Sequence, residues 1–207
     1  MTSPDPRIEF FDRHAATWDS DGPSPHELIA RLEKLDDCLE LRPSQDLLEV
    51  GCGTGALTGW LVERVRPGRV TAVDFAPAML ERARQRGADA DFVCLDVCNG
   101  DLGTARFDVI FCLHSFPHFR DQPAALAGFC RALRVGGRLI ILHLDGWRNV
   151  NAFHDQVGGA VAGDHLPGPA QLTAMLRNAG LALHRLIDQP DLFCVVARRA
   201  ADSPGAG

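Results

Sequence analysis

Lysine is nearly absent from this chain of 207 residues, in which Lys34 is the only one, and acidic residues outnumber basic ones to give a formal net charge of −6. Binding to a phosphate backbone without sequence preference requires a broad basic surface. The composition therefore argues against nucleic acid as a partner. The replacement of lysine by arginine points by itself to no function.

Long hydrophobic runs are lacking as well. No stretch approaches the roughly 20 apolar residues that a helix needs to cross a bilayer. The opening residues, MTSPDPRIEF, have neither the basic nor the apolar region of a signal peptide. We therefore expect no membrane partner and a cytoplasmic location.

The cysteines form no paired framework and the chain has no internal repeat. Seven is an odd number, and the cysteines are scattered through predicted strands and helices at Cys38, Cys52, Cys94, Cys98, Cys112, Cys130 and Cys194. Disulfide-stapled secreted domains have regular, even sets instead. With 46% hydrophobic residues, the chain is expected to be one globular domain whose thiols are free and mostly buried.

Beyond Asp46, short apolar runs bounded by Gly, Pro or Asp alternate with longer amphipathic segments, which is typical of βαβ units on a parallel sheet. Strands are predicted at 47–50, 69–74, 91–96, 107–114 and 138–144, with a closing hairpin at 182–188 and 191–198. Helices are predicted at 10–19, 28–41, 56–66, 77–86, 122–133 and 169–180, the fifth stopped by Gly136 and Gly137.

A glycine-rich turn, GCGTG, directly follows the first strand and directly precedes a helix. Gly51, Gly53 and Gly55 allow positive φ and a close approach of the backbone to a ligand. The spacing differs from the dinucleotide fingerprint G-x-G-x-x-G, and Glu49 is a poor neighbour for a diphosphate but suits a cationic ligand. A cofactor with an ammonium and a sulfonium fits better than NAD.

Acidic residues close the second and third predicted strands. Asp74 lies about 20 residues past the glycines, where a carboxylate can accept hydrogen bonds from both ribose hydroxyls. Asp96 closes the next strand in the same manner.

These features, in this order, resemble the class I S-adenosylmethionine-dependent methyltransferases. The matching segments are E-x-G-x-G-x-G at 49–55, VDFAPAML, CLDV, FDVIFCLHSFPHF and LRVGGRLII, and the resemblance covers about residues 45–145. It implies an α/β fold with a Rossmann-like, seven-stranded sheet, mostly parallel, with an antiparallel strand from the C-terminal hairpin and helices on both faces. Residues 1–44 would form a helical cap of the same domain, 45–199 the methyltransferase core and 200–207 a flexible tail.

The same resemblance implies S-adenosylmethionine as the cofactor and a small-molecule acceptor as the partner, in an unknown oligomeric state. Glu49 and the glycine turn would flank the methionine part, Asp74 would hold the ribose, and Asp96 would meet the adenine amino group. The implied cofactor-binding residues are Glu49, Gly51, Cys52, Gly53, Gly55, Asp74, Phe75, Met79, Asp96, Val97 and Leu113.

Histidines gather where the acceptor is expected. Ligands of open α/β sheets bind beyond the carboxyl ends of the strands, and five of the eight histidines lie at or after the ends of strands four and five: His114, His118, His143, His154 and His165. If these strands are neighbours, as the family order implies, His114 and His143 emerge side by side. His118, in PHFRD, is expected to be largely structural.

Two interpretations of these histidines stay open. In the first, His114 or His143 is a general base, helped by a carboxylate such as Asp145, and no metal is needed. In the second, a divalent metal is gathered by His114, His143, His154 and either Asp145 or Asp164. Alignment of the acceptor with an already activated methyl group could also suffice without a base.

Residues 146–169 are Gly-rich and irregular in sequence, and they are expected to form a lid over a small acceptor. Three alternatives to the leading hypothesis remain. They are a non-catalytic S-adenosylmethionine-binding module, an NAD-dependent Rossmann enzyme, and methylation of a metalloid through the thiolates of Cys94, Cys98 and Cys112.

Overall fold

The computed structural model describes residues 5–20 and 22–200. Its centre is a seven-stranded sheet in the order β3-β2-β1-β4-β5-β7-β6, in which only β7 runs against its neighbours β5 and β6. The strands are β1 Leu47–Val50, β2 Val70–Asp74, β3 Asp91–Cys94, β4 Phe107–Leu113, β5 Leu133–His143, β6 Leu181–Gln189 and β7 Leu192–Arg199. The predicted sheet, including its antiparallel hairpin strand, is confirmed.

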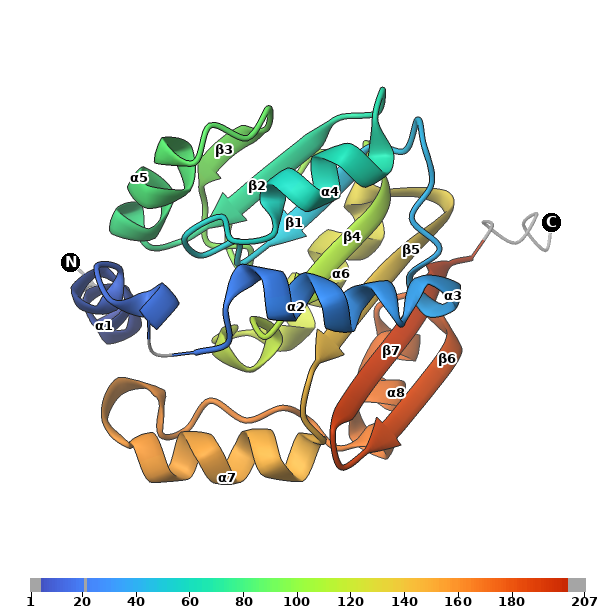
Figure 1. Cartoon of the computed structure of the whole chain (residues 1–207). Helices are drawn as coiled ribbons and strands as arrows, with labels where there is room; N and C mark the ends of the chain where they lie inside the picture. The colour runs from blue at the N-terminus through green and yellow to red at the C-terminus, as the bar shows by residue number, and fades with distance from the viewer. Residues whose placement is uncertain (1–4, 21, 201–207) are drawn as a thin grey trace, which may run out of the picture.

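Helices cover both faces of this sheet (Figure 1). They are α1 Pro6–His14, α2 Pro25–Glu33, α3 Asp36–Leu39, α4 Thr58–Val65, α5 Pro77–Gln85, α6 Gln122–Ala132, α7 Trp147–Val157 and α8 Pro169–Asn178. Short 3-10 turns lie at η1 Trp18–Ser20, η2 Phe116–His118 and η3 Gly159–Val161. Several helices begin at a capping residue that the sequence provides. At the start of α1, the side chain of Asp5 accepts a hydrogen bond from the backbone N–H of Arg7, and Pro6 occupies the first helical position.

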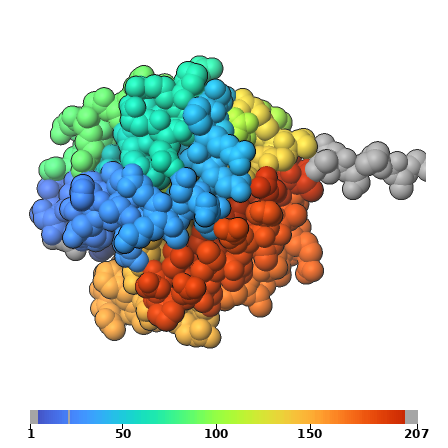
Figure 2. All heavy atoms as spheres, turned by 45° about the vertical axis from the view of Figure 1, so that its right-hand side comes forward, coloured from blue at the N-terminus to red at the C-terminus, as the bar shows by residue number. Residues whose placement is uncertain are grey.

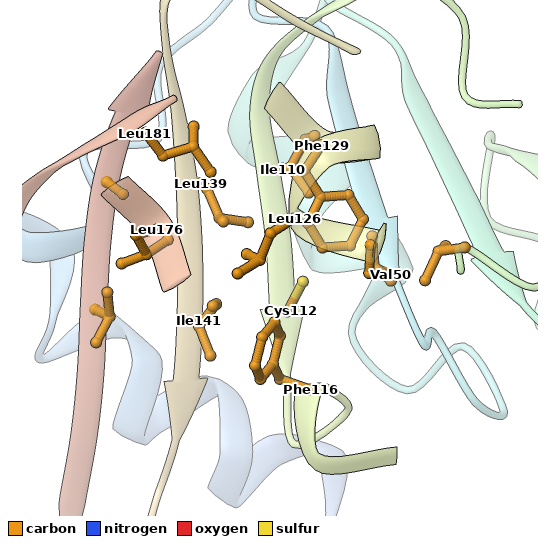
Figure 3. Close-up of a cluster of buried hydrophobic side chains, with 14 of the residues drawn as sticks. Val50, Ile110, Cys112, Phe116, Leu126, Phe129, Leu139, Ile141, Leu176 and Leu181 are labelled. Atoms are coloured by element: carbon orange, nitrogen blue, oxygen red, sulfur yellow. The ribbon is translucent and has the colours of Figure 1, made fainter. Parts of the chain in front are cut away.

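The central strands are apolar on both sides because both of their faces are buried. In β4, Val109 and Phe111 pack toward α2, α3 and α4, while Ile110 and Cys112 pack toward α6 and α8. Figure 3 shows the second layer, with Leu126 and other α6 side chains against β4. This rigid core fixes the directions in which the strands end.

The strand order reverses between β1 and β4, which are parallel neighbours whose following helices, α4 and α6, cover opposite faces. The loops after these two strands therefore diverge, and the gap between them is where open α/β sheets bind ligands. In Figure 1 the arrowheads of β1, β2, β4 and β5 point toward α1, α2 and α7. The molecule thus has a second layer of helices facing the carboxyl edge of its sheet.

Several predictions differ from the structure, and the helix predicted at 28–41 is divided into α2 and α3, with Lys34 and Leu35 between them. The helix predicted to run to Leu133 ends at Ala132, because Leu133 already pairs with Phe107, and β5 continues through Gly136 and Gly137 instead of starting after them. The segment 146–169, predicted to be irregular, contains α7, of which only Val150 and His154 are buried. The apolar residues Trp147, Val150 and Val157 recur at helical spacing in this segment, so the sequence did contain the signal for α7 and the prediction overlooked it. Of the predicted cap and tail, residues 1–4 and 201–207 lie outside the described residues.

Candidate active site

A cavity of about 810 Å³ lies between the carboxyl edge of the sheet and the helices that face it. The loops after β1, β2, β3, β4 and β5 form its floor, and residues of α1, η1, α2, α7 and η3 form its roof. Figure 2 shows the blue atoms of the N-terminal segments on this side of the molecule, next to the orange and red atoms of the C-terminal third. The cavity is therefore closed by parts of the chain that are far apart in sequence.

The glycine turn has the backbone that its sequence predicts. Gly51, Gly53 and Gly55 have φ values of 69°, 54° and 74°, in the region that residues with a Cβ rarely adopt. A Cβ on Gly51 would stand 2.4 Å from the Cβ of Ser115, and one on Gly55 would stand 2.9 Å from the Cβ of Ala83. The turn therefore packs closely against Ser115 and Ala83, and its backbone at Gly51 and Gly53 lines the cavity.

Glu49 lies beneath this turn and is 5% exposed. One of its carboxylate oxygens accepts a hydrogen bond of 2.6 Å from the hydroxyl of Thr58. Burial, together with the negative charge of Asp74, raises the pKa of Glu49 to about 8 although the bond from Thr58 opposes the shift. The carboxyl group is therefore poised to ionise when a cation enters the cavity.

We expect the affinity for S-adenosylhomocysteine, which carries an ammonium group, to rise as the pH is raised from 6 toward about 8, since a cation favours ionised Glu49 and binding then releases a proton. The limiting slope is about tenfold per pH unit for one proton. Calorimetry in buffers of different ionisation heat measures both the affinity and the proton. Glu49→Gln should flatten the profile, and a steep profile in that variant would contradict the assignment.

Asp74 ties the glycine turn to the end of β2. Its two carboxylate oxygens accept hydrogen bonds from the backbone N–H groups of Gly53 and Ala76, both at 2.9 Å. The side chain is 7% exposed, and burial raises its pKa despite these bonds. Each oxygen keeps a further acceptor position, as a pair of vicinal hydroxyls would require.

The loop after β3 supplies a second carboxylate, since the strand ends at Cys94, two residues before the predicted end at Asp96. Asp96 accepts hydrogen bonds from the backbone of Cys98 and the side chain of Asn99, both at 2.9 Å, and lies 3.5 Å from the guanidinium of Arg120. Buried Val97 lies next to it on the cavity wall. These contacts hold the carboxylate still at the cavity edge.

Apolar side chains line the space between the two aspartates. Half-buried Phe75 packs edge-on against Phe11 of α1 with ring centroids 5.5 Å apart, and Met79 lies buried on α5. Cys52 and Leu113 line the cavity too. Apolar side chains between two acidic groups provide a suitable wall for an adenosine.

The donor set fits S-adenosylmethionine in charge and shape. Buried Glu49 and Asp74 are acidic, and the cradle at Gly51 and Gly55 would be filled by a Cβ. All eleven residues that the resemblance assigned to the cofactor occur together, ten of them lining the cavity and Gly55 lying behind it: Glu49, Gly51, Cys52, Gly53, Gly55, Asp74, Phe75, Met79, Asp96, Val97 and Leu113.

His114 and His143 lie side by side at the other end of the cavity, because β4 and β5 are parallel neighbours. Their rings meet edge to face with centroids 5.3 Å apart. His114 has a φ of 56° and opens to the cavity, whereas His143 is 1% exposed. Desolvation, helped by the charge of Arg31, lowers the pKa of His114 to about 4, and desolvation lowers that of His143 well below its usual range.

The structure does not form the candidate metal site. Among residues 5–20 and 22–200 no three His, Cys, Asp or Glu side chains are grouped to hold a metal ion. His154 is engaged elsewhere, since its Nδ1 is hydrogen-bonded to the carbonyl of Asp164 and its ring lies tilted against that of His118, with centroids 4.9 Å apart.

The three thiols proposed for metalloid transfer are unsuited to it. Burial raises the pKa of Cys94 and Cys112 and raises that of Cys98 to about 11. The thiolate form that such transfer needs is therefore disfavoured.

A buried ionic network closes the rim of the cavity, and sequence reasoning missed most of it. Arg7 of α1 donates to Asp164 at 3.2 Å, and Asp164 also bonds to Nδ1 of His118 at 2.8 Å. The guanidinium reaches Asp5 and the carbonyl of His118 as well. These contacts are consistent with the structural role predicted for His118, which also lines the cavity, and the network joins the N-terminal helix to the segment that follows α7.

We expect Asp164→Asn to lower the free energy of unfolding by about 1–3 kcal/mol, because it leaves the buried charge of Arg7 less well compensated. Thermal and urea denaturation measure the change. Asp155→Asn is the matched control, because the ion pair of Asp155 with His165 lies on the surface, with side chains 59% and 50% exposed. This substitution should change the free energy of unfolding by less than about 0.5 kcal/mol. Equal effects of the two substitutions would contradict the role of the network.

A second clasp joins the N-terminal segment to the glycine turn. Asp19 accepts hydrogen bonds of 2.6 Å from the hydroxyl of Thr54 and from the guanidinium of Arg86. Arg86 in turn donates to the carbonyl of Thr54 at 2.7 Å. The clasp places Trp18, which is 40% exposed, over the cavity beside the turn. No local sequence pattern predicts these contacts of Asp19 with Thr54 and Arg86, because the residues are far apart in the chain.

Comparison with known proteins agrees with this geometry. Residues 48–141 match the family described as a methyltransferase domain. The ubiquinone biosynthesis O-methyltransferase of Xanthomonas euvesicatoria pv. vesicatoria is 34% identical over 187 residues, which are 80% of this chain and 75% of that protein. The malonyl-[acyl-carrier protein] O-methyltransferase of Acetivibrio thermocellus is 32% identical over 131 residues, which are 62% of this chain. This chain spans less than half, 46%, of the length of the second relative.

Solved structures share the fold. An S-adenosylmethionine-dependent methyltransferase from Mesorhizobium loti superposes with a TM-score of 0.69 at 18% identity, covering 82% of this chain and 98% of that one. Among the described residues no helix is long and apolar enough to cross a membrane.

Proposed function

We propose that this chain, which belongs to the class I S-adenosylmethionine-dependent methyltransferases, transfers the methyl group of its cofactor to an oxygen atom of a small organic acceptor. The observation that carries the proposal is the single cavity that has the glycine turn, Asp74 and Asp96 at one end and His114 and His143 at the other. Relatives named as O-methyltransferases support oxygen as the receiving atom.

The cofactor half is proposed to work through shape and charge. Glu49 compensates positive charge below the glycine turn, Asp74 accepts hydrogen bonds from ribose hydroxyls, and Asp96 accepts one from the adenine amino group. The bound cofactor supplies a methyl group already activated by a sulfonium. The chain's own task is then to hold the acceptor oxygen in line with that methyl group and to exclude water.

The roof is proposed to act as the lid. Three large apolar side chains that line the cavity are unusually exposed, namely Trp18 at 40%, Phe153 at 61% and Val157 at 44%. Phe153 and Val157 stand on the inner face of α7 beside buried Val150. Such exposed apolar groups mark a binding surface, and an acceptor between α7 and the sheet would cover them. His114 and His143 are proposed as its catalytic contacts.

Turnover tests the proposal. Purified protein is incubated with S-adenosylmethionine and a panel of small hydroxyl, carboxyl, amine and thiol compounds, and formation of S-adenosylhomocysteine is measured. We expect turnover with an oxygen acceptor. Tight cofactor binding without transfer to any member of the panel or to a metabolite extract would favour the non-catalytic binding module, and transfer to nitrogen or sulfur alone would reject oxygen.

A further inference from the structure

Arg31 is a cation that faces the acceptor end of the cavity without a carboxylate partner. It lines the cavity from α2, and one guanidinium nitrogen, Nη2, donates to the carbonyls of Leu144 at 2.7 Å and Asp191 at 2.9 Å. Within the described residues Arg31 forms no salt bridge, and its Nε and Nη1 groups make no hydrogen bond. Two backbone carbonyls fix the side chain while its charge and several donors stay available.

His143 brings a second unsatisfied group to the same place. Its Nε2 atom is buried and is the one fully buried side-chain nitrogen or oxygen in the described part of the chain that has no hydrogen-bond partner. An orphaned buried polar atom is costly, and native proteins rarely keep one without a reason. Because His143 lines the cavity, a ligand that enters there can supply the missing partner.

The charges around His143 indicate which charge that ligand should carry. Desolvation and the neighbouring charge of Arg31 keep His114 neutral at pH 7, and desolvation does the same for His143. A histidine whose pKa is lowered in this way is a weaker base, and it is ill suited to remove a proton from a weakly acidic hydroxyl. Neutral imidazoles and a guanidinium can all donate hydrogen bonds to an oxygen anion. Among the described residues that follow β5, Asp145 is the acidic one that lines the cavity, and its exposed carboxylate would repel an anion.

We propose that the acceptor reaches this site already ionised, as a carboxylate or a comparably acidic enol or phenol, and that Arg31 and Nε2–H of His143 bind its oxygen anion. The proposal rests on the methyltransferase function proposed above and names its acceptor class. Transfer then forms one C–O bond and breaks one C–S bond, and a cation and an anion become two neutral products. No proton has to be removed, and the loss of charge is favoured to the extent that the bound acceptor and cofactor displace water from the cavity.

Binding of matched neutral and anionic probes tests the inference. Wild-type protein saturated with S-adenosylhomocysteine is titrated calorimetrically with benzoate and benzamide, and with hexanoate and hexanamide. We expect the carboxylate of at least one pair to bind about tenfold more tightly or better, as charge-assisted hydrogen bonds predict. ¹⁵N spectra of the imidazoles should show the His143 Nε2 signal moving with the carboxylate and not with the amide.

Substitutions of Arg31 test whether its guanidinium causes the preference for the carboxylate probes. Arg31→Gln should abolish the preference for the carboxylate, and Arg31→Lys should keep part of it. Arg148→Gln is the matched control, because Arg148 stacks on Trp147 of α7 outside the cavity and should change nothing.

Failure of this inference differs from failure of the proposed function. Equal binding of amide and carboxylate, absence of binding of all four probes, or an unchanged preference in Arg31→Gln would overturn the inference while cofactor binding and turnover stand. Failure of wild-type protein to bind S-adenosylhomocysteine would overturn both.

Discussion

Gly51→Ala should weaken the binding of S-adenosylhomocysteine about 100-fold or more and also lower stability. The new Cβ would have to stand 2.4 Å from the Cβ of Ser115 and 3.0 Å from its hydroxyl oxygen. Rotation of the Ser115 side chain cannot move its Cβ away, so the loops after β1 and β4 must separate. Both loops line the cavity, and a shift of about 1 Å in such a site is costly. Calorimetry measures the affinity.

A matched glycine separates this contact from backbone strain. Gly87 has a φ of 70°, nearly equal to the 69° of Gly51, but a Cβ there would meet nothing within 4 Å. Gly87→Ala should therefore lower the free energy of unfolding by about 1–2 kcal/mol, because alanine disfavours the left-handed backbone conformation. It should leave cofactor affinity unchanged. The double variant Gly51→Ala, Ser115→Gly removes the clash and should recover part of the affinity. Equal behaviour of Gly51→Ala and Gly87→Ala would refute the role of the contact.

Asp74→Ala should have the second large effect, weakening the binding of S-adenosylhomocysteine by roughly 100-fold. Both of its oxygens hold backbone N–H groups at 2.9 Å, on Gly53 and on Ala76, and each hydrogen bond to a charged group contributes about 1.5–3 kcal/mol. The substitution frees the glycine turn from β2 and also removes the proposed ribose contacts. Asp74→Asn should not rescue binding, because one backbone N–H would then face an amide donor.

The control for Asp74 is a carboxylate that caps a helix away from the cavity. Asp121 accepts a hydrogen bond of 2.9 Å from the backbone of Ala124 at the start of α6. Asp121→Ala should lower stability by about 1 kcal/mol without changing cofactor affinity. Affinity close to that of wild type in Asp74→Ala, with stability reduced as in the control, would show that Asp74 is only a structural cap.

The cofactor half could be predicted because its signals are local. The positive φ of Gly51 follows from residue type, and the positions of Glu49 and Asp74 follow from strands whose apolar runs have clear ends. The hairpin of β6 and β7 was found for the same reason. The signal at Gly136 and Gly137 was ambiguous, because glycines can end a helix or interrupt a strand. Here β5 pairs with β4 both before and after the two glycines, so they belong to the strand.

The acceptor half could be predicted only in part, because its contacts join residues far apart in the chain. The neighbouring positions of His114 and His143 followed from strand order. The salt bridge between Arg7 and Asp164 and the place of Arg31 depend on how α1 and α2 fold across the sheet. An arginine on an amphipathic helix is ordinarily a solvated surface group, and nothing in sequence spacing marks Arg31 as different.

The division of the cavity between floor and roof has a consequence for how such a protein can change over evolution. The cofactor cradle is built into β1, β2 and β4, so most substitutions there also disturb the folding core. The roof comes from α1, α2 and α7, which contribute few core residues. Acceptor preference can therefore drift through substitutions in these helices while the methyl-donating machinery is inherited unchanged.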